Sequence, residues 1–458
     1  MKPRCATQLA LPFDAPGEQR FTWGGTGRRA NGRANDLDSR DRAFHDWYRF
    51  VLSYPPHLVR DYIRDFGLAD DSHVLLDPFC GTGTSLVEAR LNGVQTIGIE
   101  AHPFSAFASA VKVDWEVDPE PLVEATRGIA ATVLRELREH NLDDERPCDP
   151  DQCSVPLRTL TPDLMKLLIR DSISPVPLHK VLLLLDAIER HRCERYYKHC
   201  MLALANALVF QISNLRFGPE VGVGQIRRDV PVVAPWLSEI GKMADDLRRL
   251  PGGPYPGACV YQADARDIAR VLPPRSVDAV ITSPPYPNEK DYTRTTRLES
   301  VVLGFIADKN DLRDVKRRLV RSNTRGVYSD DRDDEKVQEN PEIQAIADSI
   351  ERRRIELGKT SGFERLYARV TKLYFGGMAR HLADLRGILR PGARLAYVVG
   401  DQASYLQVMI PTGRLLADIA MAWGYELIRI DLFRTRFATA TKQQLREEVV
   451  VLRWPKEG

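Results

Sequence analysis

The sequence has no apolar run long enough to cross a membrane and no cysteine pattern of a disulfide scaffold. A bilayer requires about 18 to 20 consecutive apolar residues, and no stretch approaches that length. The seven cysteines are odd in number and irregularly spaced, which is typical of a reducing compartment. The N-terminus lacks the basic and then apolar pattern of a secretion signal. We therefore expect a soluble cytoplasmic protein without membrane association.

Net charge is also nearly absent. The chain carries 65 lysine and arginine residues against 63 aspartate and glutamate residues, a formal charge of +2. Arginine outnumbers lysine and is the better residue for bidentate contacts with phosphate and guanine, but a GC-rich genome explains the same excess. Charge alone therefore leaves the partner open.

Short apolar runs predict the fold class. The chain of 458 residues is long enough for a catalytic core with added elements. Runs at 73–77 and 95–100 flank a helical segment, and this strand–helix–strand unit begins a doubly wound, Rossmann-like α/β sheet. Further strands are expected in the segments CVYQAD, VDAVITS, RLAYVVGD, YELIRIDLF and EEVVVLRW.

Composition divides the chain further. Residues 1–44 are rich in Gly, Arg, Asn and Asp, which predicts a flexible N-terminal arm. The catalytic core is expected at 45–118 and 256–458, interrupted by a helical insertion at 119–255. Within the core, 305–360 is a highly charged insertion and a candidate for DNA recognition.

A glycine-rich turn, DPFCGTGT, begins at Asp77 after the first predicted strand. Triphosphate binding is disfavoured because no lysine follows the glycines. A dinucleotide fingerprint needs a third glycine where Leu86 stands, although Glu100 lies where a ribose-binding acid is expected. The turn therefore favours a ligand with ribose but no pyrophosphate, or else is an ordinary crossover. Asp77 would attract the amino-acid portion of that ligand, and Glu100 would accept both ribose hydroxyls.

A second motif, Ser283-Pro284-Pro285-Tyr286, follows the strand VDAVIT directly. Two consecutive prolines fix an extended turn and remove two backbone donors, which leaves carbonyl acceptors. Such a turn suits methylation of an amino group on a planar base, whose lone pair is delocalised into the ring. The Ser283 hydroxyl and the Pro284 carbonyl would accept the amine's hydrogen bonds and redirect its lone pair. Tyr286 would stack on the base and favour the positive charge that passes through the site.

Together the two motifs resemble those of the amino-directed (N4-cytosine and N6-adenine) DNA methyltransferases. DPFCGTGT is similar to their cofactor motif and SPPY to their catalytic motif. Glu100, Asp264, the closing REEVVVLRW and, more weakly, YPPHLV also match. The resemblance implies a seven-stranded methyltransferase sheet and S-adenosylmethionine as methyl donor. Because members with serine at the first catalytic position lean toward cytosine, it implies site-specific transfer to N4 of cytosine by direct displacement on a flipped base.

The expected site residues fall into three groups. The expected cofactor-binding residues are Asp77, Pro78, Phe79, Gly81, Gly83, Thr84, Glu100, Asp264 and Ala265. The expected catalytic residues are Ser283, Pro284, Pro285 and Tyr286. The expected substrate-binding residues are Asn288, Lys290, Tyr292, Arg294, Arg317 and Arg321.

Neither metal binding nor nucleophilic catalysis by a cysteine is expected. No metal site is expected, because the helical spacing of His191, Cys193, His199 and Cys200 spreads them over several faces. Cys80 is expected to pack beneath the cofactor turn rather than to act as a nucleophile.

Three basic segments are candidates for contact with double-stranded DNA. They are the arm around Arg28, Arg29 and Arg33, the loop from Arg216 to Asp229, and the run Arg313, Lys316, Arg317, Arg318, Arg321 and Arg325. The last is the best placed because it follows the catalytic turn. A cognate restriction endonuclease is a further candidate partner. The expected state is a monomer or dimer in a bacterial or archaeal cytoplasm, associated with the nucleoid.

Other functions remain open at this point. They are methylation of adenine N6 in DNA, of guanine N2 in RNA or of a protein glutamine amide, and a catalytically silent nucleic-acid binder. The intact residues Asp77, Gly81, Gly83, Ser283 and Tyr286 argue against the silent binder, which has no need of the catalytic turn.

Overall fold

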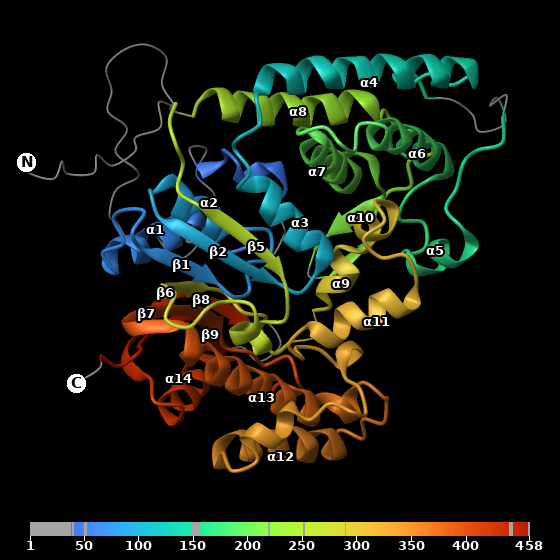
Figure 1. Ribbon diagram of the computed structural model, residues 1–458. Coiled ribbons are helices and arrows are strands. Elements are labelled where there is room, and N and C mark those ends of the chain that lie inside the picture. Colours follow the sequence, from blue (N-terminus) through green and yellow to red (C-terminus); the bar gives the residue numbers. More distant parts are fainter. Residues whose placement is uncertain are drawn as a thin grey trace, which may run out of the picture.

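A seven-stranded sheet forms the centre of the molecule (Figure 1). The computed structural model describes residues 38, 41–49, 53–147, 155–218, 220–250, 252–288, 290–438 and 443–456. The sheet strands are β1 (Val74–Asp77), β2 (Gln95–Glu100), β5 (Ala258–Gln262), β6 (Val277–Thr282), β7 (Leu389–Gly400), β8 (Glu426–Ala438) and β9 (Gln443–Arg453). A separate hairpin contains β3 (Leu215–Phe217) and β4 (Val221–Val223).

The strand order is β5-β2-β1-β6-β7-β9-β8. Strands β5, β2, β1, β6 and β7 are parallel, and β9 is antiparallel to both β7 and β8. The connections run outward in opposite directions from β1 and β6, so a topological switch point lies between these two strands. Ligands bind at such points, outside the carboxyl ends of the strands.

Helices cover both faces of the sheet. On one face, α1 (Pro56–Asp65) and α2 (Thr84–Leu91) pack on inward side chains such as Leu75 and Ile281. On the other face, α13 (Tyr367–Leu385) and α14 (Thr412–Ala422) pack on alternate side chains such as Leu76 and Val280. This alternation follows from the two-residue period of a strand and confirms the predicted α/β class.

The predicted helical insertion follows α3 (Pro103–Lys112), and its apolar side chains form one cluster with those of α2, α3 and the residues 44–48. Its helices are α4 (Pro119–Glu139), α5 (Pro162–Leu167), α6 (Pro175–Glu189), α7 (Tyr197–Ala207) and α8 (Val233–Arg248). Figure 1 shows α4 and α8 side by side on the outer side of this region. A π-helical turn (Leu208–Ile212) ends α7, and the β3–β4 hairpin follows it, an element that the helical pattern did not indicate.

The charged segment contains helices, one of which packs against α13. After the short helices α9 (Tyr292–Thr295) and α10 (Arg297–Val302) come α11 (Lys309–Arg318) and α12 (Pro341–Glu356). Buried side chains of α12, including Ile343 and Ile350, belong to the same apolar cluster as α13. Of the described helices, none is long and apolar enough to cross a membrane.

Candidate active site

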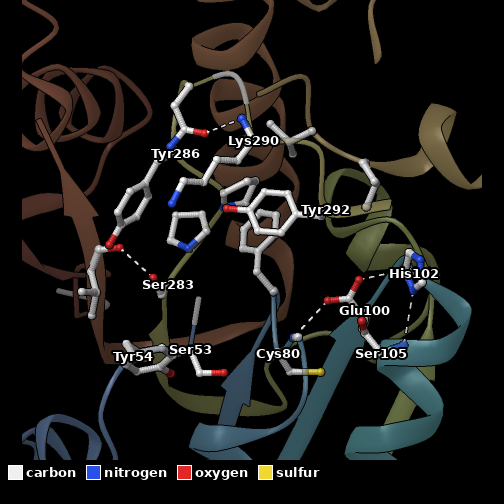
Figure 2. Close-up of a pocket in the computed structure, with 18 of the residues that line it drawn as sticks. Ser53, Tyr54, Cys80, Glu100, His102, Ser105, Ser283, Tyr286, Lys290 and Tyr292 are labelled. Carbon is white, nitrogen blue, oxygen red and sulfur yellow. Dashed lines mark hydrogen bonds between the residues drawn. The ribbon is translucent and has the colours of Figure 1, made fainter. Parts of the chain in front are cut away.

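A cavity of about 650 Å³ opens at the carboxyl ends of β1, β2 and β6 (Figure 2). One side is formed by the glycine-rich turn and the end of β2, and the opposite side by the Ser-Pro-Pro-Tyr turn. The sequence-predicted residues that line it are Pro78, Phe79, Gly81, Thr84, Glu100, Asp264, Ala265, Ser283, Pro284, Pro285, Tyr286, Asn288, Lys290 and Tyr292. The structure therefore brings both motifs to one cavity.

Positive backbone φ angles shape the glycine-rich turn. Gly81 has a φ of 51° and Gly83 a φ of 85°, a region that favours glycine. A side chain at Gly83 would also meet Ser109 at 3.2 Å. Gly83 packs against α3 outside the cavity, whereas Gly81 lines it. Cys80 is buried, and burial raises the pKa of its thiol, consistent with a packing role rather than a nucleophile.

Asp77 lies beneath both motifs rather than in the cavity wall. Its carboxylate accepts hydrogen bonds from the Thr282 hydroxyl at 2.6 Å, the Phe79 N–H at 3.1 Å and the Tyr54 hydroxyl at 3.3 Å, and from Ser85. Burial raises the pKa of Asp77 to about 6. Its oxygens are thus engaged in joining the ends of β1 and β6, and Asp77 is not among the residues that line the cavity. Its direct contact with the ligand stays a prediction.

Glu100 faces the cavity from the end of β2. One carboxylate oxygen accepts the His102 N–H at 2.7 Å and the other accepts the Gly81 N–H at 3.0 Å. Burial nevertheless raises the pKa of Glu100 to about 7. Each oxygen keeps a further lone pair, so the side chain is oriented by the backbone and is able to accept two ligand hydroxyls.

His102, which also lines the cavity, was not predicted from the sequence. Its Nδ1 accepts the Ser105 N–H at 3.4 Å, and its Nε2 lies 3.1 Å from the Thr296 hydroxyl. Burial lowers the pKa of His102 to about 4, so the ring is neutral and Nε2 is its donor. The only available sequence signal is its position immediately after the strand that ends in Glu100.

Asp264 and Ala265 form the wall beyond β5. Both Asp264 oxygens accept hydrogen bonds from the Arg266 guanidinium, at 2.9 Å and 2.6 Å. The Ala265 carbonyl lies 2.8 Å from Nδ1 of His381, whose ring makes an edge contact with Phe79 at 4.9 Å between centroids. These contacts hold the wall in one conformation.

The catalytic turn begins where β6 ends. Pro284 is buried, while Ser283, Pro285 and Tyr286 are half-buried and exposed to the cavity. The Ser283 hydroxyl donates to the Val398 carbonyl at 3.3 Å (Figure 2). It also interacts with the Tyr286 hydroxyl, which places the tyrosine side chain beside the serine.

Two residues from the last strands of the sheet also hold Tyr286. A side chain at Gly400 would come within 3.1 Å of the tyrosine ring and 3.2 Å of Glu447, so the ring and the carboxylate pack closely over this glycine. Burial is the main reason that the pKa of Tyr286 is raised, and the nearby Glu447 carboxylate adds to it. Tyr286 is therefore un-ionised and can place a neutral ring against a substrate.

The expected substrate-binding residues separate into two groups. Asn288, Lys290 and Tyr292 line the cavity, and Figure 2 shows Lys290 and Tyr292 between its two sides. Arg294, Arg317 and Arg321 do not line it. The buried Arg321 guanidinium is bound to Asp331 at 2.7 Å, and Arg317 is paired with Asp330 at 2.7 Å. Their charges serve the fold of the segment, and the cavity is lined instead by the neighbouring Arg318.

The cavity wall also includes residues that were not assigned to the site from the sequence. They are Phe433, Arg434 and Arg436 of β8, Leu445 and Glu447 of β9, and Glu220 of the insertion. Arg436 pairs with Glu447 at 2.9 Å, and Arg434 is also bound to it. Ser53 and Tyr54, which precede α1, complete the wall at the segment that resembles the element closing over the methionine end of the cofactor.

Comparison with known proteins identifies the reaction class. Residues 67–140 match a family model described as the RMKL-like methyltransferase domain of UPF0020. The chain is 24% identical over 454 residues to the type II methyltransferase M.BsoBI of Geobacillus stearothermophilus, covering 91% of this chain and 85% of that relative. These similarities indicate that the protein is a methyltransferase and imply S-adenosylmethionine as its methyl donor.

Other relatives of this methyltransferase match shorter parts or match more distantly. The type II methyltransferase M.AvaI of Nostoc sp. is 27% identical over 190 residues, 39% of this chain and 38% of the relative. Among solved structures, the rRNA methyltransferase aviRa from Streptomyces viridochromogenes aligns at 12% identity with a TM-score of 0.33, over 93% of this chain and 96% of that one. The sequence relatives confirm the methyltransferase resemblance of the two motifs.

The described residues form no cluster of three or more potential metal ligands. Cys193 is exposed, and Cys200 is buried in the apolar core of the insertion. The His199 ring lies 3.1 Å from the Asp114 carbonyl. Cys148, Cys153 and the arm with Arg28, Arg29 and Arg33 lie outside the described residues.

Proposed function

We propose that this methyltransferase transfers a methyl group to the exocyclic N4 of cytosine in double-stranded DNA. The observation that carries the proposal is the single cavity shared by the Ser-Pro-Pro-Tyr turn and the residues suited to the cofactor. The similarity to type II methyltransferases over most of the chain supports it. The serine at position 283 favours cytosine over adenine by family resemblance.

The cofactor half of the cavity fits S-adenosylmethionine. Glu100 would accept the two ribose hydroxyls with the lone pairs that its backbone contacts leave free. The φ of 51° at Gly81 lets the turn bend without a side chain beside the ligand. Phe79, Asp264 and Ala265 form the wall available to the adenine, and Ser53 and Tyr54 lie toward the methionine end. When bound, this cofactor supplies an electrophilic methyl group on a sulfonium.

The target half would hold the amine and the base ring. The Ser283 hydroxyl and the Pro284 carbonyl accept the two amine hydrogens, which frees the nitrogen lone pair from the ring. Tyr286, fixed through Ser283 and supported at Gly400, stacks against the base. These contacts stabilise positive charge on the nitrogen as the bond forms.

A base in a duplex cannot reach this cavity unless it leaves the stack, so the target nucleotide must be flipped. The amine would attack the methyl carbon directly as the bond from that carbon to sulfur breaks, and the nitrogen would then lose one proton to solvent. No enzyme–base covalent adduct is needed. Because the Cys80 thiol is buried and its pKa is raised, the chain offers no thiolate at this turn for the ring-carbon type of methylation.

A label-transfer assay tests the substrate class. The enzyme is incubated with tritiated S-adenosylmethionine and, separately, with duplex DNA, RNA and a protein extract. The proposal predicts label in DNA alone, with no incorporation by the Tyr286→Ala variant. Label confined to RNA or to protein would overturn it.

A further inference from the structure

The β3–β4 hairpin extends from the helical insertion to the cavity. Glu220, between its two strands, lines the cavity. The carboxylate of Glu220 is also close enough to Lys290 to oppose the lowering of that lysine's pKa by burial. The insertion thus borders the space into which a flipped base must pass.

The base of the hairpin is held rigidly by Asn214. Its side-chain amide donates to the Asp171 carbonyl at 3.0 Å and to the Ser174 hydroxyl at 3.1 Å. The side-chain oxygen of Asn214 accepts a hydrogen bond from the Arg227 backbone N–H at 3.0 Å. The backbone carbonyl of Asn214 accepts one from the Gly224 N–H at 2.7 Å. Every polar group of this side chain is therefore used to fix where the hairpin leaves the insertion.

Arg227 also stabilises the base of the hairpin. The Arg227 guanidinium donates to the Gln211 carbonyl at 2.8 Å and to the Ser213 carbonyl. Further along the chain, Asp229 pairs with the buried Lys180 at 2.8 Å. A hairpin tied at both ends presents its outer side chains in a fixed geometry, which sequence readout requires.

The outer surface of this region carries basic groups that form no ion pair with the described residues. Arg216 lies opposite Gly222, which has no side chain to cover it, and both Arg216 and Arg228 are exposed. In the described part of the chain neither forms an ion pair, and Gln225 and Ile226 between them are exposed as well. Phe210, also exposed, packs on Phe217 with 5.6 Å between centroids.

The charged segment 305–360 differs because acids of the chain pair with several of its basic groups, although Arg313, Arg318 and Arg325 form no ion pair among the described residues. Lys316 pairs with Asp291 at 3.1 Å, and Arg317 and Arg321 pair with Asp330 and Asp331. Arg353 and Arg354 of α12 pair with Glu356 and Glu351. Contact with a phosphate or a base would require most of these pairs to break.

We infer that the β3–β4 hairpin, with the exposed residues Phe210, Arg216, Gln225, Ile226 and Arg228, is the element that reads the DNA sequence beside the target base. The inference rests on the proposed function. A two-stranded ribbon fits the major groove of B-DNA, where arginine binds guanine and glutamine binds adenine, each by two hydrogen bonds. The hairpin borders the cavity, so it would contact the bases next to the flipped one.

The test compares sites methylated in a random-sequence duplex library by the wild type, Arg216→Ala, Gln225→Ala and Arg353→Ala. Arg353 is the matched control, because it is an exposed arginine paired within α12. We expect Arg216→Ala and Gln225→Ala to lower the preference for the wild-type sequence over single-base variants by about 10- to 100-fold. Arg353→Ala keeps the wild-type preference.

Cofactor affinity, measured by titration without DNA, confirms that each variant is folded. An unchanged site preference in both hairpin variants, or an equal loss in Arg353→Ala, would overturn the inference while leaving the proposed function intact. Failure of the wild type to label any DNA would overturn both.

Discussion

The two halves of the cavity are built in different ways. The cofactor half comes mainly from consecutive elements, β1, the glycine-rich turn, α2 and β2, and its residues lie between positions 78 and 105 apart from Ser53, Tyr54, Asp264 and Ala265. The target half combines the turn at 283–292 with the β8–β9 hairpin, the residues 318–320 and Glu220 of the insertion. The residues of the first half are thus mostly close together in the sequence. The residues of the second half are far apart in the sequence and are brought together by folding.

This difference separates binding from chemistry. Changes in the cofactor half are expected to alter S-adenosylmethionine affinity, and changes in the target half are expected to alter transfer at a nearly constant affinity. Asp77 joins the two halves, because it bonds to Thr282 directly before the catalytic turn and to Phe79 in the cofactor turn.

The largest effect is expected from Tyr286→Ala. Loss of the ring removes both the stacking surface and the favourable charge interaction, so the transfer rate falls by about a thousandfold. The dissociation constant for S-adenosylmethionine changes less than about twofold. Single-turnover kinetics and cofactor titration measure the two quantities. The Tyr286→Phe variant keeps the ring and serves as the control, and a large loss of cofactor affinity in Tyr286→Ala would remove the division between the halves.

Ser283→Ala is expected to lower the transfer rate by about a hundredfold, since one acceptor for the amine is lost. The substitution also releases the Tyr286 hydroxyl. Measured by single-turnover kinetics, Ser283→Thr should recover part of the rate because it restores the hydroxyl. Equal rates for the alanine and threonine variants would show that the hydroxyl has no part in transfer.

Glu100→Gln tests the cofactor half and is expected to weaken S-adenosylmethionine binding by about 10- to 30-fold, the loss of charge-assisted hydrogen bonds. Because burial raises the pKa of Glu100 to about 7, ionisation increases through neutral pH, and wild-type affinity should rise between pH 6 and pH 8. The amide does not titrate, so the variant should lose this increase. Calorimetric titration at several pH values measures both effects, and an unchanged pH dependence in the variant would contradict the assignment.

Glu100 also affects the stability of the protein without cofactor. Its pKa in the folded state, about 7, lies above the ordinary value of 4.5 for a glutamate, so the folded state binds its proton more tightly. The contribution of Glu100 to stability is therefore present below about pH 4.5 and is lost as the pH rises toward about 7.

Asp77→Asn is expected to affect both halves through stability. The amide cannot accept all the hydrogen bonds that the carboxylate accepts, and its N–H group meets the Ser85 or Thr282 hydroxyl instead. A loss of about 1 to 3 kcal/mol in the free energy of unfolding follows, measured by denaturant titration. Unchanged stability together with a large loss of cofactor affinity would instead favour direct contact between Asp77 and the ligand.

The smallest effect is expected from Arg317→Ala. Its guanidinium is exposed and paired with Asp330, outside the cavity, and solvent screens exposed ion pairs so that they contribute little. DNA affinity and the transfer rate should stay within about twofold of the wild type. A loss as large as that of Arg216→Ala would return the recognition role to the charged segment.

The sequence predicts the parts of the fold that have a strong local pattern. All seven strands of the main sheet were expected, because their apolar runs end in turns or acids. The predicted β8 run ended at Phe433, but the strand continues to Ala438. The extension RTRFA lacks an apolar run because it is paired with β9 at the border of the cavity rather than buried in the sheet.

The site follows the same rule. DPFCGTGT, Glu100 and SPPY were found because each has a fixed local spacing, and they meet at one cavity. Arg436 and Glu447 have no such spacing, and their pairing depends on the register of β8 and β9. The basic run at 313–325 was predicted to contact DNA because it follows the catalytic turn. Its ion pairs with Asp291 and Asp331 depend on the folded structure and could not be predicted from the sequence.

The most direct test is nucleoside mass spectrometry of duplex DNA methylated by this enzyme in vitro. Transfer to the amine held by Ser283 and Pro284 predicts N4-methylcytosine as the one modified nucleoside, absent from reactions with Tyr286→Ala. N6-methyladenine would contradict the assignment of the target base, and 5-methylcytosine would contradict the direct transfer to an exocyclic nitrogen.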